Sequence, residues 1–139
     1  MTVRGLNHLT LSVSDLSRSI AFYRDGLGLT LDAEWPEGAY LSVGNLWLCL
    51  SLDAATRHGP SDEYTHIAFD VAAADFANIV ERLTAAGSKA WRDNKSEGSS
   101  HYVLDPDGHK LELHVGNLES RLDHYRQSSR ADVTVHRKE

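Results

Sequence analysis

The sequence contains the same pattern twice, and this internal repeat limits the folds open to the chain more than any other feature. The segment HLTLSVSDLSRSIAFY begins at His8, and HIAFDVAAADFANIVERL begins 58 residues later at His66. In each copy, alternating residues indicate a strand, and a 3.6-residue apolar period then indicates a helix. Three more strand-like runs complete each copy. Repeated units bury their apolar faces by packing against neighbouring units, so the repeat predicts two similar modules.

Each copy predicts the order strand, helix, strand, strand, strand. In the first copy the predicted helix follows Ser14 or Asp15, either of which can accept hydrogen bonds from its first turn. The elements expected there span residues 5–13, 16–24, 29–35, 39–43 and 46–52. Those expected in the second copy span 64–71, 73–86, 88–92, 102–104 and 110–115, with a last helix at 118–127.

These elements predict an α+β protein of two tandem βαβββ modules. Four-stranded curved mixed sheets of this kind must close against another surface, which suggests that they pair in a homodimer. We expect the first module at residues 1–52, a linker loop at 53–63 and the second module at 64–116. The remainder, 117–139, is predicted to be a C-terminal helix with a loose polar tail.

Composition excludes several classes of function. The 139 residues carry a net charge of −6 with scattered Lys and Arg, so no basic surface for nucleic acid is expected. The chain has no apolar run near 18 residues and no apolar N-terminal core of a secretory signal. Its single cysteine, Cys49, cannot form an intrachain disulfide. A cytoplasmic protein is the simplest interpretation.

The repeat also predicts a metal site. His8 and His66 occupy equivalent positions, and Glu112 stands between two leucines on the last strand of the second copy. Two imidazoles and a carboxylate form a three-ligand set for a divalent ion of the Mn, Fe, Co, Ni or Zn group. The equivalent of Glu112 in the first copy falls near Leu48, which cannot ligate, so positions on the ion stay open for substrate. His114 has the spacing to be a ligand as well, but we prefer a supporting or solvated role for it.

The polar loop before that last strand predicts an anion site beside the cation. The stretch from Asn94 to His114, NKSEGSSHYVLDPDGHKLELH, combines hydroxyl groups, an amide and a glycine backbone with the strand of Glu112. On its own it equally fits a surface loop before a hairpin. The paired histidines and Arg92, just before the loop, favour the site.

With these residues in place, the chain resembles the vicinal oxygen chelate superfamily and, within it, the FosA family of fosfomycin-resistance glutathione transferases. The segments that carry the resemblance cover most of residues 5–122: GLNHLTLSVSDL, SIAFYRDGLGL, GAYLSVGNLWLCLS, YTHIAF, NKSEGSSHYVLDPDGHKLELHVGNL and SRL. The combination of WLCLS, YTH and the N-K-S-E-G-x-S loop is more specific than the metal pattern alone.

The resemblance implies an enzyme that adds glutathione to fosfomycin and opens its epoxide ring. It implies Mn²⁺ on His8, His66 and Glu112, with His8 coming from one subunit of a homodimer and the other two ligands from its partner. It further implies that Thr10 contacts the oxirane, and that a cage holds the phosphonate: Arg92, Ser96, Ser100, Tyr102 and Arg121. Fixed guanidinium and hydroxyl donors suit a dianion.

The resemblance implies two more sites. A potassium ion would lie in the loop, on Asn94, Ser96, Gly98 and Ser100. Trp47 and Tyr64 would form the walls of the fosfomycin pocket. Tyr40 would lie near the glutathione thiol, and the glutathione channel would be lined by Trp35, Ser51 and Lys95.

The sequence departs from the family at two site positions. Arg92 stands where the family usually has lysine, and Ile67 where tyrosine is common. Three alternatives remain open: a glyoxalase I-like isomerase, a transferase that uses bacillithiol or another thiol, and a metal-free drug-binding protein of the same fold. The isomerase would be expected to need a fourth protein ligand.

Overall fold

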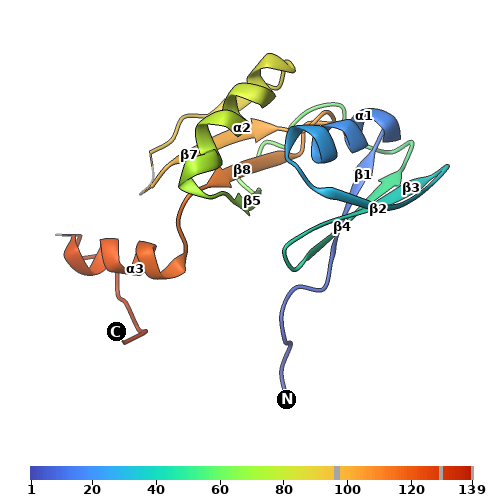
Figure 1. Cartoon of the computed structure of the whole chain (residues 1–139). Coiled ribbons are helices and arrows are strands. Elements are labelled where there is room, and N and C mark those ends of the chain that lie inside the picture. The colour runs from blue at the N-terminus through green and yellow to red at the C-terminus, as the bar shows by residue number, and fades with distance from the viewer. Residues whose placement is uncertain (96–97, 129, 139) are drawn as a thin grey trace.

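The computed structural model describes residues 1–95, 98–128 and 130–138, and its strands form two separate four-stranded sheets (Figure 1). The first module contains β1 (Leu9–Val13), α1 (Leu16–Ala21), a π-helical turn η1 (Phe22–Gly26), β2 (Thr30–Trp35), β3 (Gly38–Val43) and β4 (Leu46–Leu52). The second contains β5 (Ile67–Asp70), α2 (Ala73–Ala85), β6 (Ala90–Arg92), β7 (Ser100–Leu104) and β8 (Lys110–His114). Helix α3 (Leu118–Gln127) follows and stands clear of both sheets in Figure 1.

The two sheets have the same topology. The strand orders are β1-β4-β3-β2 and β5-β8-β7-β6, and in each the first strand runs parallel to the last strand of its module. The other neighbours are antiparallel. The predicted fold class of two βαβββ-like units is therefore confirmed.

The core lies between the sheets and the helices. On the sheets it is built from every second residue of the central strands, because successive side chains point to opposite faces. Its fully buried members include Leu48 and Leu50 from β4, and Leu111 and Leu113 from β8. Leu83 of α2 packs so tightly that a Cβ added to Gly26 would lie 3.0 Å from it. The opposite face of each sheet is left for polar and aromatic side chains.

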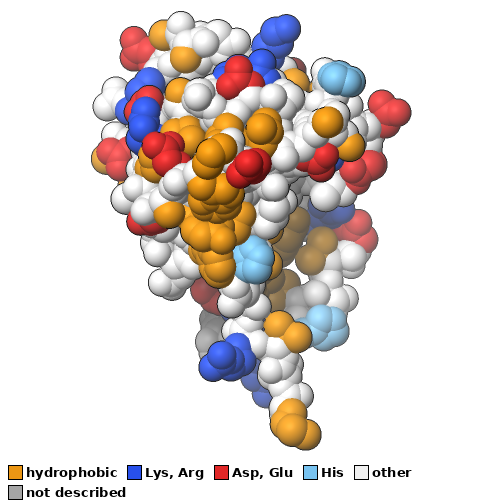
Figure 2. Space-filling view, turned by 90° about the vertical axis from the view of Figure 1, so that its right-hand side faces the viewer, with side chains coloured by type: hydrophobic (Ala, Val, Ile, Leu, Met, Phe, Trp, Pro, Cys, Tyr) orange, Lys and Arg blue, Asp and Glu red, His pale blue; other side chains and the backbone are white. Residues whose placement is uncertain are grey.

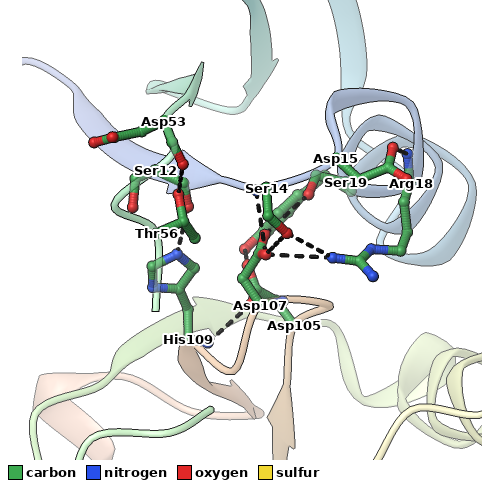
Figure 3. A network of polar contacts seen from close by, with 11 residues as sticks. Ser12, Ser14, Asp15, Arg18, Ser19, Asp53, Thr56, Asp105, Asp107 and His109 are labelled. Carbon is green, nitrogen blue, oxygen red and sulfur yellow. Dashed lines mark hydrogen bonds and ion pairs between the residues drawn. The ribbon is translucent and has the colours of Figure 1, made fainter. Parts of the chain in front are cut away.

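A polar network joins the modules at the turn between β7 and β8 (Figure 3). Asp107 accepts hydrogen bonds from the amide and hydroxyl of Ser14 and forms an ion pair with Arg18, 3.3 Å away. His109 Nε2 lies 2.8 Å from the carbonyl oxygen of Ser12. The end of β1 and the start of α1 are thus tied to the second module.

Asp105 in the same turn is buried and also bridges the modules. It accepts a hydrogen bond from the hydroxyl of Tyr23 at 2.8 Å and two more from backbone amides of its own turn. Burial raises the pKa of the Asp105 carboxyl, and burial and the nearby carboxylate raise the pKa of Tyr23. This pair therefore places a carboxyl group deep in the junction between the modules.

Three local predictions need correction or refinement. The strands predicted to begin at residues 5 and 64 begin at Leu9 and Ile67, so His8 and His66 each directly precede a strand. The helix predicted at 16–24 is α-helical only to Ala21 and then widens to a π-turn. Asp15, not Ser14, caps it, because its side chain accepts from the amide of Arg18 at 3.0 Å. Among the described residues, no helix is long and apolar enough to cross a membrane.

Candidate metal and anion site

Two of the predicted metal ligands meet on the second sheet. His66 Nε2 lies 3.0 Å from Glu112 Oε1. The other ring nitrogen, Nδ1, lies 2.9 Å from the carbonyl oxygen of Tyr64, which can only accept a hydrogen bond. In the neutral ring, Nε2 therefore carries a lone pair that faces the carboxylate. Two lone-pair donors side by side, with the far nitrogen held by a carbonyl, fit a divalent cation.

His8, on the first module, also has its Nδ1 hydrogen-bonded. Its Nδ1 lies 2.7 Å from Asn7 Oδ1, which leaves Nε2 available, and the side chain is exposed. The imidazole packs on Trp47 with ring centroids 4.6 Å apart.

A single chain does not bring the three predicted ligands together. Within residues 1–95, 98–128 and 130–138, no three His, Cys, Asp or Glu side chains are grouped so that they could hold a metal ion. His66 and Glu112 form one part of the predicted set, and His8 lies on the other sheet.

Glu112 is buried, and one of its carboxylate oxygens is held by neighbouring side chains. Ser100 Oγ donates to Oε2 at 2.7 Å, and His114 Nδ1 lies 3.3 Å from the same oxygen. The strand pairing explains this contact, because Ser100 on β7 is directly opposite His114 on β8, two residues beyond Glu112. The carboxylate can therefore present Oε1 toward His66 while Oε2 stays hydrogen-bonded.

A cationic and aromatic patch adjoins Glu112. Arg92 and Tyr102 are paired across β6 and β7, and Tyr102 is paired with Glu112. The Arg92 guanidinium lies over the ring of Tyr64 at 4.5 Å and near that of Tyr102 at 5.6 Å. The pKa of the Tyr64 hydroxyl is raised, mainly by desolvation and to a smaller extent by a hydrogen bond with Tyr102. A fixed cation and two tyrosine hydroxyls beside a carboxylate form a suitable setting for a phosphonate next to a metal ion.

The corresponding face of the first sheet is aromatic and exposed. The rings of Trp35, Tyr40 and Trp47 follow one another, with centroids 4.8 and 5.2 Å apart. Thr10 and Ser51 are exposed on neighbouring strands. Figure 2, which looks onto the right-hand side of Figure 1, shows a continuous apolar area with a histidine at its border. The residues predicted to contact the oxirane and glutathione are therefore concentrated here, apart from Lys95.

The strand register corrects one prediction. Thr10, two residues after His8, pairs with Cys49, and Ala68, two residues after His66, pairs with Glu112. The first-module equivalent of Glu112 is therefore Cys49, and the prediction of Leu48 is wrong. Leu48 belongs to the opposite face, in the core, whereas Cys49 is buried on the face of Thr10 and Tyr40.

The predicted potassium loop is described only in part. Asn94 Nδ2 donates to the carbonyl oxygen of Gly98 at 2.9 Å, which closes the loop on itself. Ser96, predicted for both the potassium site and the phosphonate cage, lies outside the described residues. Lys95 is exposed in this loop, and Arg121 is half-buried on α3.

Sequence reasoning missed one aromatic contributor, Trp91. Its ring lies 5.1 Å from Tyr102 and 5.6 Å from His66, and its Nε1 donates to the carbonyl of Leu111 at 2.9 Å. Simple alternation from Arg92 would direct Trp91 away from the site. A register irregularity between Ala90 and Arg92 breaks that alternation, and nothing in the sequence indicates it.

Comparisons with known proteins place the chain in a family. Residues 5–113 match the model of the Glyoxalase/Bleomycin resistance protein/Dioxygenase superfamily. The chain is 57% identical over 122 residues to a glutathione transferase FosA from Serratia marcescens, covering 86% of each sequence. It is 39% identical to a metallothiol transferase FosB from Lysinibacillus sphaericus, covering 91% of this chain and 93% of the relative. Among solved structures, the fosfomycin resistance protein FosX from Listeria monocytogenes, complexed with Mn(II) and sulfate, superposes with a TM-score of 0.78. That match has 31% identity and covers 89% of this chain and 99% of FosX.

Proposed function

This chain belongs to the glyoxalase/bleomycin resistance protein/dioxygenase superfamily, and we propose that it is a glutathione transferase that inactivates fosfomycin by opening its epoxide ring. The observation that carries the proposal is the face of the second sheet. That face combines two metal-ligating groups, Glu112 and His66, with anion-binding groups from Ser100, Arg92 and Tyr102. Fosfomycin needs both, because it carries a phosphonate next to its reactive oxirane.

We propose that His66 and Glu112 hold a divalent ion, Mn²⁺ by analogy with the Mn(II) complex of FosX, together with His8 of a second copy. The support is that His8 and His66 each have Nδ1 hydrogen-bonded and Nε2 unused by the backbone, although they lie on different sheets. The exposed aromatic face that carries His8 would then be covered in a homodimer with active sites shared between subunits. When bound, the ion would supply Lewis acidity to the substrate oxygens.

The chain's own residues would bind and orient the substrate. Arg92 would donate to the phosphonate while Tyr64 and Tyr102 keep its guanidinium in place. Ser96 and Arg121 would complete the cage, Ser100, whose hydroxyl donates to Glu112, would border it, and Trp47 would pack against the carbon skeleton. Holding the oxirane carbon in line with the thiol removes much of the entropic part of the barrier.

The reaction itself requires no protein nucleophile. The glutathione sulfur forms a bond to an oxirane carbon, the carbon–oxygen bond breaks, and the released oxygen takes up a proton. Thr10 would hydrogen-bond that oxygen, and Tyr40 would hydrogen-bond the thiolate. We assign Trp35, Ser51 and Lys95 to the glutathione channel, and a potassium ion to the loop of Asn94, Ser96, Gly98 and Ser100. The cytoplasm, where glutathione keeps thiols reduced, is the expected compartment.

A direct assay tests the function. Purified protein is incubated with Mn²⁺, K⁺, fosfomycin and glutathione, and the adduct is detected by mass spectrometry and phosphorus NMR. We expect the adduct only when Mn²⁺ is present. The same assay with bacillithiol or without thiol separates the proposed reaction from that of a metallothiol transferase or a hydrolase. Absence of the glutathione adduct, with turnover of hemithioacetal or another thiol instead, would refute the proposal.

A further inference from the structure

His114 makes a contact that the proposed reaction does not require of it. Its Nδ1 lies 2.6 Å from Ser100 Oγ and 3.3 Å from Glu112 Oε2. Ser100 Oγ lies in turn 2.7 Å from Glu112 Oε2. Three polar groups from β7 and β8 thus form a closed triangle, and one of them is the proposed metal ligand Glu112.

Counting protons assigns a direction to each bond. An ionised carboxylate can only accept, so the single hydroxyl proton of Ser100 goes to Glu112. The remaining lone pairs of Ser100 Oγ can then only accept from His114, which requires the proton of the His114 ring to be on Nδ1. The same N–H also points near Glu112 Oε2.

Two glycines leave the space that the ring of His114 occupies. A Cβ added at Gly98 would lie 3.3 Å from the His114 Cε1 atom and 2.7 Å from the carbonyl oxygen of Val115. A Cβ added at Gly116 would lie 3.0 Å from His114 Nε2 and 3.1 Å from Ser120 Oγ. Their φ angles, +79° and +135°, also favour glycine. The ring therefore fits between the end of the 94–100 loop and the segment that leads into α3.

We propose that His114 is a positioning residue, whose Nδ1–H fixes the Ser100 hydroxyl and, through it, the orientation of the Glu112 carboxylate. Without this donor the serine hydroxyl can rotate away from Glu112. Oε2 then loses a hydrogen bond, and Oε1 is no longer held toward His66. The proposal rests on the metal site proposed above, and it adds that the site is organised from a residue that is not itself a ligand.

Two substitutions distinguish positioning from packing. The amide nitrogen of asparagine falls close to the place of Nδ1, whereas that of glutamine falls close to the place of Nε2. His114→Asn should therefore retain the donor, and His114→Gln should lose it, although both remove the ring. His101→Gln is the matched control, since His101 is half-buried on β7 but is paired with Leu113 on the other face of the sheet.

The first readout is the affinity of metal-free protein for Mn²⁺ alone, measured by titration calorimetry. We expect His114→Gln to weaken binding about tenfold or more, and His114→Asn and His101→Gln to stay within about threefold of the parent. Equal losses for the asparagine and glutamine variants, or no loss for either, would overturn the proposal. Circular dichroism identifies any variant that fails to fold.

The second readout needs neither metal nor turnover. In the metal-free protein, nitrogen–proton correlation spectra of ¹⁵N-histidine-labelled protein, assigned with His114→Asn, should show the His114 proton on Nδ1. A ring protonated on Nε2 alone would overturn the proposal even if the protein is an active transferase. Conversely, an Nδ1 proton and the expected Mn²⁺ affinities would stand even if fosfomycin is not the substrate.

Discussion

Replacing Asp107 with alanine should separate the two modules energetically without touching the proposed site. The Asp107 side chain is only 2% exposed and lies in the β7–β8 turn. It accepts from the amide of Ser14 at 3.2 Å, from the Ser14 hydroxyl and from Arg18, and Ser19 Oγ lies 3.5 Å away (Figure 3). Asp107→Ala removes the common acceptor of all these donors at once.

The size of the loss follows from the exposure of the donors. A hydrogen bond to a buried charged group contributes about 1.5–3 kcal/mol, and a stranded buried donor costs about 1–3 kcal/mol. Ser19 is fully buried and cannot reach water, but Ser14 is exposed, and Arg18, half exposed, contributes little once it is hydrated. We therefore expect Asp107→Ala to lower the free energy of unfolding by about 3 kcal/mol, and Asp107→Asn, which keeps one acceptor oxygen, by about half as much.

This loss is measured by urea unfolding of the metal-free protein, at one fixed protein concentration, with tryptophan fluorescence as the signal. Asp62→Ala, which removes an exposed carboxylate from the linker, should change stability by less than about 0.5 kcal/mol. A double-mutant cycle of Asp107→Ala with Ser14→Ala should give a coupling of about 1 kcal/mol. A loss below about 1 kcal/mol for Asp107→Ala would refute the assignment of this network as the tie between modules.

Three further predictions concern the site and the junction. Glu112→Ala should weaken Mn²⁺ binding at least about 100-fold, as measured by calorimetry, whereas the control Glu81→Ala on α2 should not. An unchanged Mn²⁺ affinity of Glu112→Ala would remove Glu112 from the ligand set. Arg92→Ala should lower kcat/KM for fosfomycin about 10- to 100-fold, because a charge-assisted bond to the phosphonate is lost. Arg57→Ala serves as the control. Unaltered kinetics of Arg92→Ala would exclude Arg92 from the cage. Burial raises the pKa of the Asp105 carboxyl above its ordinary 3.8, so the folded state holds this proton more tightly and the resulting stabilisation is lost as pH rises through the folded value. Asp105→Asn should therefore flatten the decline of unfolding free energy with pH from about pH 4 upward, whereas an unchanged slope would assign that decline to other groups.

The sequence predicted the fold because its signals are local and repeated. The alternation of β4 and β8 and the helical period of α2 each identify an element, and the repeat confirms the order independently. The equivalence of His8 and His66 was predicted for the same reason. The structure refines this prediction, because each histidine directly precedes its strand, and Nδ1 of His66 lies 2.9 Å from the carbonyl oxygen of Tyr64.

The parts that could not be predicted depend on register between strands. Alternation fixes which residues share a face within one strand, but not which residue of the next strand stands opposite. An error of one residue gave Leu48, whose side chain lies in the core, in place of Cys49, whose side chain lies on the site face. The contact of Ser100 with His114 is of the same kind, since those residues are fourteen apart in sequence and opposite each other in the sheet.

The corrected register bears on how the two modules would divide the chemistry of the proposed site. Both keep a histidine before the first strand, but the residue paired two positions after that histidine is Glu112 in the second module and Cys49 in the first. The second face therefore carries a carboxylate, whose charge Arg92 and the proposed metal ion would balance. The first face adds no carboxylate and is lined by Trp47, Tyr40 and Trp35, so it can contribute one neutral ligand and apolar walls without changing that balance. The proposed shared site would therefore combine one face of each kind, because the second face offers two of the three proposed ligands and the first face offers one.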